Sequence, residues 1–286
     1  MERTAQGPGC LIKIRSVYPS LAKVNKRIAD RILENPREVI TLPVTELAER
    51  AEASEASVVG FCKKLGYQGF HDLKFVLAEE VFSSSSDIHE EIDSHDDVPV
   101  TIKKVFNTSI QTLKDTMNIL DPSALEAAAR TILQAERILI VGTGISGMVA
   151  EDFWMKLFRI NRNVSFHNNQ TTMKMAAAVA KAGDVVVAIS HSGSTKAVIE
   201  TLKMAKARGA KTIGLTNYLN TPVSKLADIL LLTSSRETGV REEEMTARIA
   251  QLAVVDSLFV VVANSSYETS AANLRHTRAA VSDDKI

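Results

Sequence analysis

Cysteine is scarce in this chain of 286 residues, where only Cys10 and Cys62 occur. Two cysteines so far apart do not form a disulfide framework, so they are expected to be reduced thiols. Neither sign of charge is in excess, because 34 basic residues balance 34 acidic ones. This balance excludes a general attraction to nucleic acid, membrane surfaces or acidic substrates, and any charged partner must be recognised by a local cluster.

Long apolar runs are also missing. No stretch reaches the roughly 20 uninterrupted apolar residues that span a bilayer, and the N-terminal MERTAQGPGC lacks the apolar segment of a signal peptide. We therefore expect a cytoplasmic protein with no membrane partner. Apolar residues still make up 45% of the chain, which is enough for the cores of two domains.

The segment 83–98, SSSSDIHEEIDSHDDV, divides the chain. It holds four consecutive serines and six acids but no Lys or Arg. A composition so poor in core-forming side chains predicts a solvated linker. The expected domains are therefore residues 1–82 and residues 99–286.

The region before the linker is expected to be all helical, and residues 44–70 contain two short helical patterns separated by a tight break. The second pattern has apolar residues at helical spacing, namely Val58, Phe61, Cys62 and Leu65. Ser54 is the expected N-cap of this helix and Gly66 its expected end. Such a pair is either a simple packing unit or a helix-turn-helix, whose second helix can enter the major groove of DNA.

Local charge favours the DNA-binding alternative. Residues 11–37 carry seven basic side chains against two acids, and basic side chains on such a helix pair can contact phosphates. The candidate DNA-binding residues are Ser54, Ser57, Val59, Lys63, Lys64 and Lys26.

The stretch VTELAERAEASEASVVGFCKKLGYQGFHDLK resembles the N-terminal domain of RpiR-type bacterial transcriptional regulators, over roughly residues 11–82. Two positions depart from that family. Glu52 stands where such turns usually carry Gly, and Gly60 stands where the family usually has a basic residue that could reach DNA. Gly60 also weakens its helix by up to about 1 kcal/mol relative to Ala.

The region after the linker alternates strands with helices. Strands are expected at 137–141, 163–167, 184–189, 211–215 and 228–232, and helices at about 100–119, 122–134 and 244–264. Intervening helices of this length predict βαβ units and a five-stranded parallel sheet, which is an α/β fold.

The first strand runs into Gly142, Gly144 and Gly147, which have the GxGxxG spacing of a dinucleotide-binding turn. Such a site also needs an Asp or Glu at the end of the second strand. That strand ends in His167, Asn168 and Asn169, so a dinucleotide cofactor is not expected.

Hydroxyl groups cluster after the third strand, at Ser190, Ser192, Gly193, Ser194 and Thr195. Hydroxyls and backbone N–H groups at a helix N-terminus suit one phosphate group, and Ser146 in the first loop adds another hydroxyl. A capped helix without a ligand is the alternative for a single such run. No P-loop pattern is present, and the histidines do not have metal-ligand spacing, so we expect neither a nucleotide triphosphatase nor a metal site.

Three segments, VGTGISGMVAEDFWMKLFRIN, VVVAISHSGSTKAVIE and REEEMTARIAQLAVVDSLF, resemble the SIS (sugar isomerase) domain over roughly residues 101–275. The resemblance implies a three-layer αβα sandwich that binds a sugar phosphate. It implies that Ser190, Ser192 and Thr195 hold the phosphate while Ser146 lies against the sugar, and Glu237 is a further candidate. Glu242, Glu243 and Glu244 depart from the small residues of regulatory members.

These resemblances imply a transcriptional regulator, expected to be a repressor of sugar or amino-sugar catabolism. A homodimer or larger homo-oligomer would bind a pseudo-palindromic operator in double-stranded DNA, and a hexose or amino-sugar 6-phosphate would modulate its affinity. No cofactor and no catalytic residue are expected. The alternative is a phosphosugar isomerase or lyase, with Glu237 or one of Glu242 to Glu244 as the base and His167 or His191 assisting.

Overall fold

The computed structural model describes residues 9–83, 95–235 and 245–282. The chain divides into two compact units, Met1–Thr108 and Ser109–Ile286, and the division falls within one helix, α7 (Val98–Ile119). The middle of the predicted linker, residues 84–94, lies outside the described residues. On either side of it, α6 ends at Ser83 and α7 begins at Val98.

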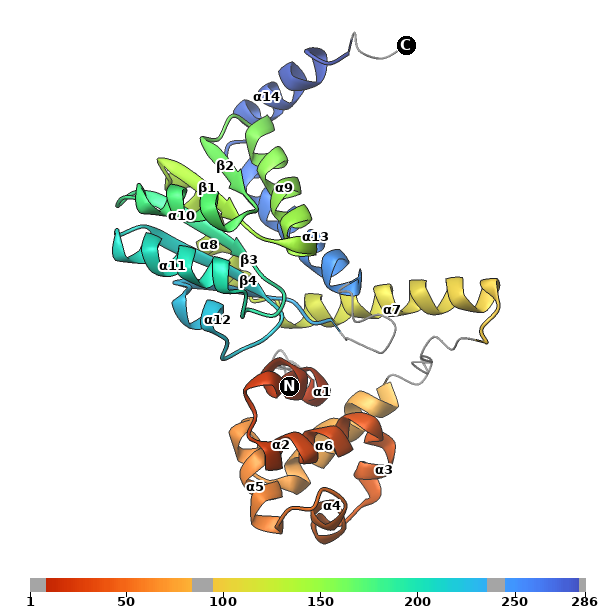
Figure 1. Ribbon diagram of the computed structural model, residues 1–286. Helices are drawn as coiled ribbons and strands as arrows, with labels where there is room; N and C mark the ends of the chain where they lie inside the picture. Colours follow the sequence, from red (N-terminus) through yellow and green to blue (C-terminus); the bar gives the residue numbers. More distant parts are fainter. Residues whose placement is uncertain (1–8, 84–94, 236–244, 283–286) are drawn as a thin grey trace, which may run out of the picture. The chain divides into compact units, whose positions relative to one another are not determined.

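The first unit is helical, as predicted (Figure 1). Its helices are α1 (Cys10–Val17), the short 3-10 helix η1 (Tyr18–Ser20), α2 (Lys23–Glu34), α3 (Pro36–Thr41), α4 (Val44–Arg50), α5 (Glu55–Lys64) and α6 (Phe70–Ser83). One core joins them, built on fully buried Ile28, Leu47 and Phe61. Both cysteines are free and buried in it, and burial raises the pKa of the Cys62 thiol to about 11.

The helix pair α4 and α5 is joined by the tight break that the sequence predicts. Ser54 caps α5, because its Oγ accepts a hydrogen bond from the Ser57 N–H at 3.2 Å. Gly66 follows the end of α5 with φ of 89°. Both predicted ends of the second helix are therefore confirmed.

Glu52 lies in this break with φ of 47°, a conformation that favours glycine. Its side chain is exposed, and its carbonyl and that of Ala51 accept hydrogen bonds from the Arg27 guanidinium. Hydrogen bonds to the backbone of Glu52 therefore hold the turn, and the presence of a side chain on Glu52 makes its positive-φ conformation strained.

Replacing Glu52 with glycine is expected to raise the free energy of unfolding by about 1 kcal/mol, because the positive φ then carries no steric penalty. Urea denaturation of the intact chain measures the change. The matched control is Glu49→Gly in the preceding helix α4, which should lower the free energy of unfolding by about 1 kcal/mol. Equal destabilisation by both substitutions would contradict the assigned strain.

The second unit is an α/β domain in which five strands form one parallel sheet of order β2-β1-β3-β4-β5. The strands are β1 (Arg137–Val141), β2 (Val164–His167), β3 (Asp184–Ile189), β4 (Lys211–Thr216) and β5 (Ile229–Leu232). The helices are α8 (Pro122–Gln134), α9 (Gly144–Arg159), α10 (Gln170–Ala178), α11 (Lys196–Ala207), α12 (Pro222–Leu226), α13 (Met245–Asn264) and α14 (Tyr267–Ala279). The predicted α/β fold and its five parallel strands are confirmed.

Helices cover both faces of the sheet and make the predicted three-layer sandwich (Figure 1). Ile138 and Ile140 of β1 pack into one core with α8, α9 and α13. Leu139 and Val141 of the same strand pack into the opposite core with α10, α11 and α12. This alternation follows from the period of two along a strand.

Helix α13 is long and apolar enough, over Thr246–Asn264, to cross a membrane by length and composition alone. A buried core helix passes the same test. In the structure α13 packs against α8 and α9, and its apolar side chains Val254, Val255 and Leu258 are buried in that core. Its composition is therefore explained by its place in the sandwich.

Candidate functional sites

The predicted phosphate-binding loops lie side by side at one edge of the sheet. Strands β1 and β3 are neighbours, and the loops at 142–146 and 190–195 follow their carboxyl ends. The sheet order changes direction between these two strands, because β2 lies on one side of β1 and β3 on the other. Ligands of open α/β folds bind at such a switch point.

In the first loop, Ser146 is 4% exposed at the start of α9. Its Oγ accepts hydrogen bonds from the His191 backbone N–H and from Gln251 Nε2, each at 3.3 Å. The loop is compact enough that a Cβ at Gly142 would lie 2.7 Å from the Ser146 carbonyl oxygen. The first loop therefore contacts both the second loop and α13.

In the second loop, Ser190 and Thr195 turn toward each other, with 3.1 Å between their hydroxyl oxygens. Ser192 and Ser194 are exposed, and Ser192 Oγ accepts from the Ser194 N–H at 3.2 Å. All four hydroxyls thus belong to one short loop in front of α11, as the sequence predicts.

Gly193 fixes the path of this loop. Its φ is 62°, and its N–H donates to the Ser190 carbonyl. The Gly193 carbonyl accepts from the Val223 N–H at 3.0 Å, and Thr216 Oγ1 donates to the His191 carbonyl at 3.0 Å. The loop is therefore held by Thr216, the last residue of β4, and by Val223 of α12, neither of which the sequence analysis had singled out.

The helices of the α/β domain differ in whether a side chain caps their N-terminus. Side chains of Asp121, Asn169 and Thr221 cap α8, α10 and α12. In contrast, α9 and α11 follow Thr143 and Thr195 without a side-chain cap, and so does α14 after Ser266. Because the first N–H groups of a helix lack partners within it, both helices that begin at the paired loops leave such groups to bind an anion.

The second strand ends in His167, beside Val141 in the register of the sheet. Burial, together with the nearby Arg137, holds the pKa of His167 below its ordinary value. The imidazole is therefore neutral at pH 7 and can exchange hydrogen bonds without attracting a phosphate by charge. Asn169, two residues further on, caps α10.

The other groups considered at this edge of the sheet are His191, possible metal ligands and the candidate acids. His191 is 2% exposed, and its ring packs edge-to-face with the Tyr218 ring, with 5.5 Å between the two ring centres. Over residues 9–83, 95–235 and 245–282, no group of three His, Cys, Asp or Glu residues could hold a metal ion. Glu237 and Glu242 to Glu244, the candidate acids, lie outside the described residues.

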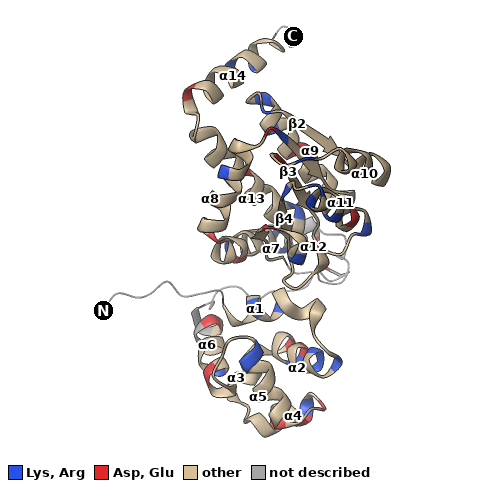
Figure 2. Ribbon diagram, turned by 90° about the vertical axis from the view of Figure 1, so that its left-hand side faces the viewer, with Lys and Arg blue, Asp and Glu red and all other residues tan. Residues whose placement is uncertain are grey.

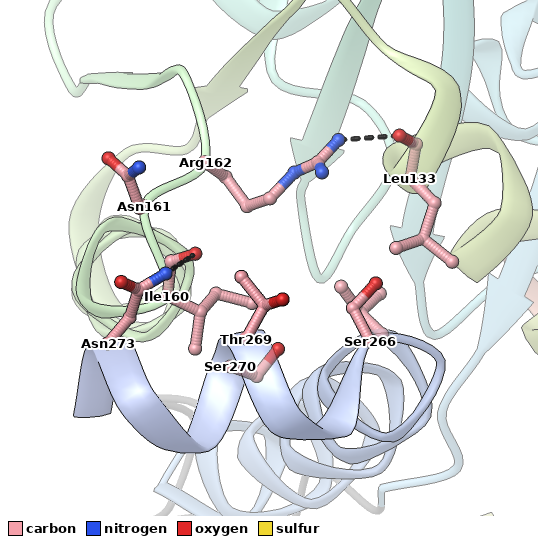
Figure 3. A pocket seen from close by; sticks show the side chains of 9 residues that line it. Leu133, Ile160, Asn161, Arg162, Ser266, Thr269, Ser270 and Asn273 are labelled. Carbon is pink, nitrogen blue, oxygen red and sulfur yellow. Dashed lines mark hydrogen bonds between the residues drawn. The ribbon is translucent and has the colours of Figure 1, made fainter. Parts of the chain in front are cut away.

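A separate cavity of about 170 Å³ lies near the amino ends of β1 and β2 (Figure 3). Arg162 lines it and donates hydrogen bonds to the carbonyls of Ile132 and Leu133 at 2.8 and 2.6 Å. The guanidinium thus satisfies carbonyls at the end of α8, as a basic group near a helix C-terminus does. This cavity is a packing feature at the edge of the sheet opposite to the hydroxyl loops.

In the helical unit, α5 presents a polar outer face. Val58, Phe61 and Cys62 are buried, whereas Lys63 and Lys64 are exposed. Of the other predicted DNA-binding residues, Ser57 and Val59 are partly exposed on α5, and Ser54 is the exposed cap. Lys26 lies on α2, with its Nζ 5.4 Å from the centre of the Tyr18 ring.

Part of the basic stretch has a structural role that the sequence analysis missed. Arg27 donates to the Ala51 carbonyl at 2.9 Å, and Arg31 donates to the Arg50 carbonyl at 3.0 Å. Both arginines therefore bind backbone at the end of α4. Figure 2 shows acidic and basic residues interleaved over α2, α3 and α4.

Comparison with known proteins supports a helix-turn-helix unit followed by an α/β unit. A family model described as a helix-turn-helix domain of the rpiR family matches residues 8–84, and an SIS domain model matches residues 131–261. An HTH-type transcriptional regulator of Caldanaerobacter subterraneus is 38% identical, over 96% of this chain and 98% of that protein. RpiR of Escherichia coli is 30% identical, over 96% of this chain and 93% of its own length.

Among solved structures, the NanR protein of Vibrio vulnificus in complex with ManNAc-6P matches with a TM-score of 0.61 and 27% identity. The match covers 95% of this chain and 97% of that one. The relatives from Caldanaerobacter subterraneus and Escherichia coli are named as transcriptional regulators, and they align with this chain along nearly their whole length. This chain accordingly belongs to the RpiR family of transcriptional regulators, in which a helix-turn-helix domain is joined to an SIS domain.

Proposed function

We propose that the chain is a repressor of sugar or amino-sugar catabolism, released from its operator by a sugar phosphate that binds between the loops after β1 and β3. The observation that carries the proposal is the pair of uncapped helices, α9 and α11, beginning at two hydroxyl-bearing loops at the switch point of the sheet. The free N–H groups and hydroxyls there match one phosphate dianion.

The residues have separate roles in this site. Ser190, Ser192 and Thr195 bind the phosphate, together with backbone N–H groups of the first turn of α11. Ser146 contacts the sugar, and the distance of its loop from the phosphate loop is set by its bond to the His191 N–H. Glu237 is a further proposed contact to the sugar.

An amino-sugar 6-phosphate is the favoured effector. NanR of Vibrio vulnificus, which aligns with 95% of this chain, is described in complex with ManNAc-6P. The neutral His167 beside the first loop and the hydroxyls around it offer hydrogen bonds to an uncharged sugar. ManNAc-6P is therefore the first ligand to test.

Regulation follows from linkage. A ligand that prefers one arrangement of a homodimer shifts the spacing of its two DNA-reading helices, and DNA must shift ligand affinity by the same factor. We propose that exposed Met148, Met155 and Phe158 of α9 lie in the dimer interface. A symmetric dimer reads half-sites about 34 Å apart in a pseudo-palindromic operator.

The DNA contacts are proposed to come from the outer face of α5. Lys63 and Lys64 reach phosphates, whereas Ser57 and Val59 approach the bases, with Ser54 at the cap and Lys26 on the neighbouring helix. Most of the affinity then comes from phosphate contacts, so binding weakens steeply as salt rises.

Replacing Gly60 with lysine is expected to tighten DNA binding severalfold, because a Cβ at this position meets no atom within 4 Å and the side chain extends from the outer face of α5. The added charge should steepen the dependence of log affinity on log salt by about one. Gel retardation at three salt concentrations measures both. Gly60→Gln is the matched control, since it gains the same helix propensity without a charge, and an equal effect of the two variants would contradict a phosphate contact.

The proposed function is tested by two measurements on the intact chain. A thermal-shift screen with ManNAc-6P, glucose 6-phosphate and ribose 5-phosphate should raise Tm for at least one ligand, because a ligand of the native state stabilises it. Gel retardation with that ligand should then show weaker DNA binding. Conversion of a sugar phosphate together with no DNA binding would favour the isomerase alternative.

A further inference from the structure

Gln251 is a polar side chain in an apolar place. It lies on α13 with none of its surface exposed, and its neighbours on the buried face of that helix are apolar: Ala247, Ala250, Val254, Val255 and Leu258. Its Nε2 donates a hydrogen bond to Ser146 Oγ at 3.3 Å. Its Oε1 is buried and has no hydrogen-bond partner among the residues that the structure describes.

This arrangement does not serve the stability of the fold. A buried acceptor without a partner destabilises the folded chain, and an apolar side chain of the same shape avoids that loss. Polar groups that break the pattern of a core in this way are typical of functional sites. Among the residues that the structure describes, the one hydrogen bond of the Gln251 side chain runs to the Ser146 hydroxyl, which is expected to lie against the sugar.

The hydrogen bonds of Ser146 show what this bond does. A serine hydroxyl has one hydrogen to donate and two lone pairs to accept with. The His191 N–H and Gln251 Nε2 both donate to Ser146 Oγ, so both lone pairs are used. The hydroxyl hydrogen is then the part of the Ser146 side chain that is left for a ligand.

We propose that Gln251 is a positioning residue of the effector site, which holds the Ser146 hydroxyl as a donor toward an acceptor oxygen of the bound sugar phosphate. The inference rests on the proposed function and deepens it. Gln251 thereby selects a ligand with an acceptor oxygen at this point, and it joins the ligand to α13 through a single side chain.

The test replaces Gln251 with methionine, which has nearly the same shape and no amide. Ser146 Oγ then loses one donor, and its hydrogen is no longer directed at the ligand. The affinity for ManNAc-6P, measured by calorimetry on the intact chain, should fall about tenfold or more. Without ligand, Tm should stay the same or rise, which a purely structural role of Gln251 would not produce.

A double-mutant cycle separates the route through Ser146 from other effects. In a Ser146→Ala background, Gln251→Met should change affinity less than twofold, because the hydroxyl that it orients is gone. Ser257→Ala is the matched control on the same helix, since that hydroxyl is exposed and bonds to the Ala253 carbonyl of its own helix. It should leave affinity unchanged.

The possible results distinguish the positioning role of Gln251 from the proposed function of the chain. The positioning role is wrong if wild type binds ManNAc-6P and Gln251→Met binds it equally well. It is also wrong if Gln251→Met lowers the Tm without ligand along with the affinity. In both cases the proposed function stands. If wild type binds none of the sugar phosphates in the screen, the proposed function is overturned and this inference with it.

Discussion

Gly193→Ala should abolish measurable sugar-phosphate binding and lower the free energy of unfolding by about 2–5 kcal/mol, since it combines a strained backbone with overpacking. A Cβ on Gly193 would lie 2.2 Å from Thr221 Oγ1, 2.7 Å from Thr221 Cβ and 2.8 Å from Thr216 Oγ1. Its φ of 62° also disfavours any side chain. The loop must therefore move away from β4, and the hydroxyls that it carries move with it.

Gly144→Ala provides a matched control. Gly144 has nearly the same φ, 58°, but a Cβ there meets no atom within 4 Å. This substitution should lower the free energy of unfolding by only about 1–2 kcal/mol, from the backbone strain alone. Urea denaturation compares the two variants. Equal losses would mean that the contacts with Thr216 and Thr221 do not hold the loop.

Replacing Ser190 and Ser192 together with alanine is expected to weaken sugar-phosphate binding by about 100-fold or more. A hydrogen bond to a charged group contributes about 1.5–3 kcal/mol, and the double variant removes two of them. The free energy of unfolding should fall only modestly, because the variant loses the Ser190–Thr195 and Ser192–Ser194 hydrogen bonds and each contributes about 0.5–1.5 kcal/mol.

DNA affinity in the absence of ligand should be unchanged in this double variant, because both serines lie in the SIS domain. Calorimetry gives the ligand affinity, and gel retardation gives the DNA affinity with and without ManNAc-6P. Thr131→Ala serves as control, since its hydroxyl bonds to the Ala127 carbonyl within α8. A double variant whose DNA binding still responds to ligand would refute the assignment of the phosphate loop.

Most features that depend on a local sequence pattern, such as strands and the loops that follow them, are predicted from the sequence. Apolar runs between helices predict all five strands, and each predicted end lies within one residue of the observed one. The hydroxyl run from Ser190 to Thr195 and Ser146 in the first loop can also be predicted from the sequence, because each lies just after a predicted strand. Parallel strands then bring the two loops to one edge, as the structure shows.

What the sequence analysis missed depends on contacts between distant residues. Gln251 contacts a serine 105 positions earlier, and in a single sequence it is one polar residue on an apolar helix. Arg27 and Arg31 look like phosphate ligands until the fold brings α4 within their reach. Helix α14 has few apolar residues, so its sequence carries no stripe to predict it.

The central claim is that sugar phosphate and DNA are linked through this chain. Its most direct test is a linkage measurement on the intact protein, with a duplex selected from a random library as the DNA. We expect ManNAc-6P to weaken DNA binding, and the duplex to weaken ManNAc-6P binding by the same factor. A chain that binds both ligands with neither affinity changed by the other would contradict it.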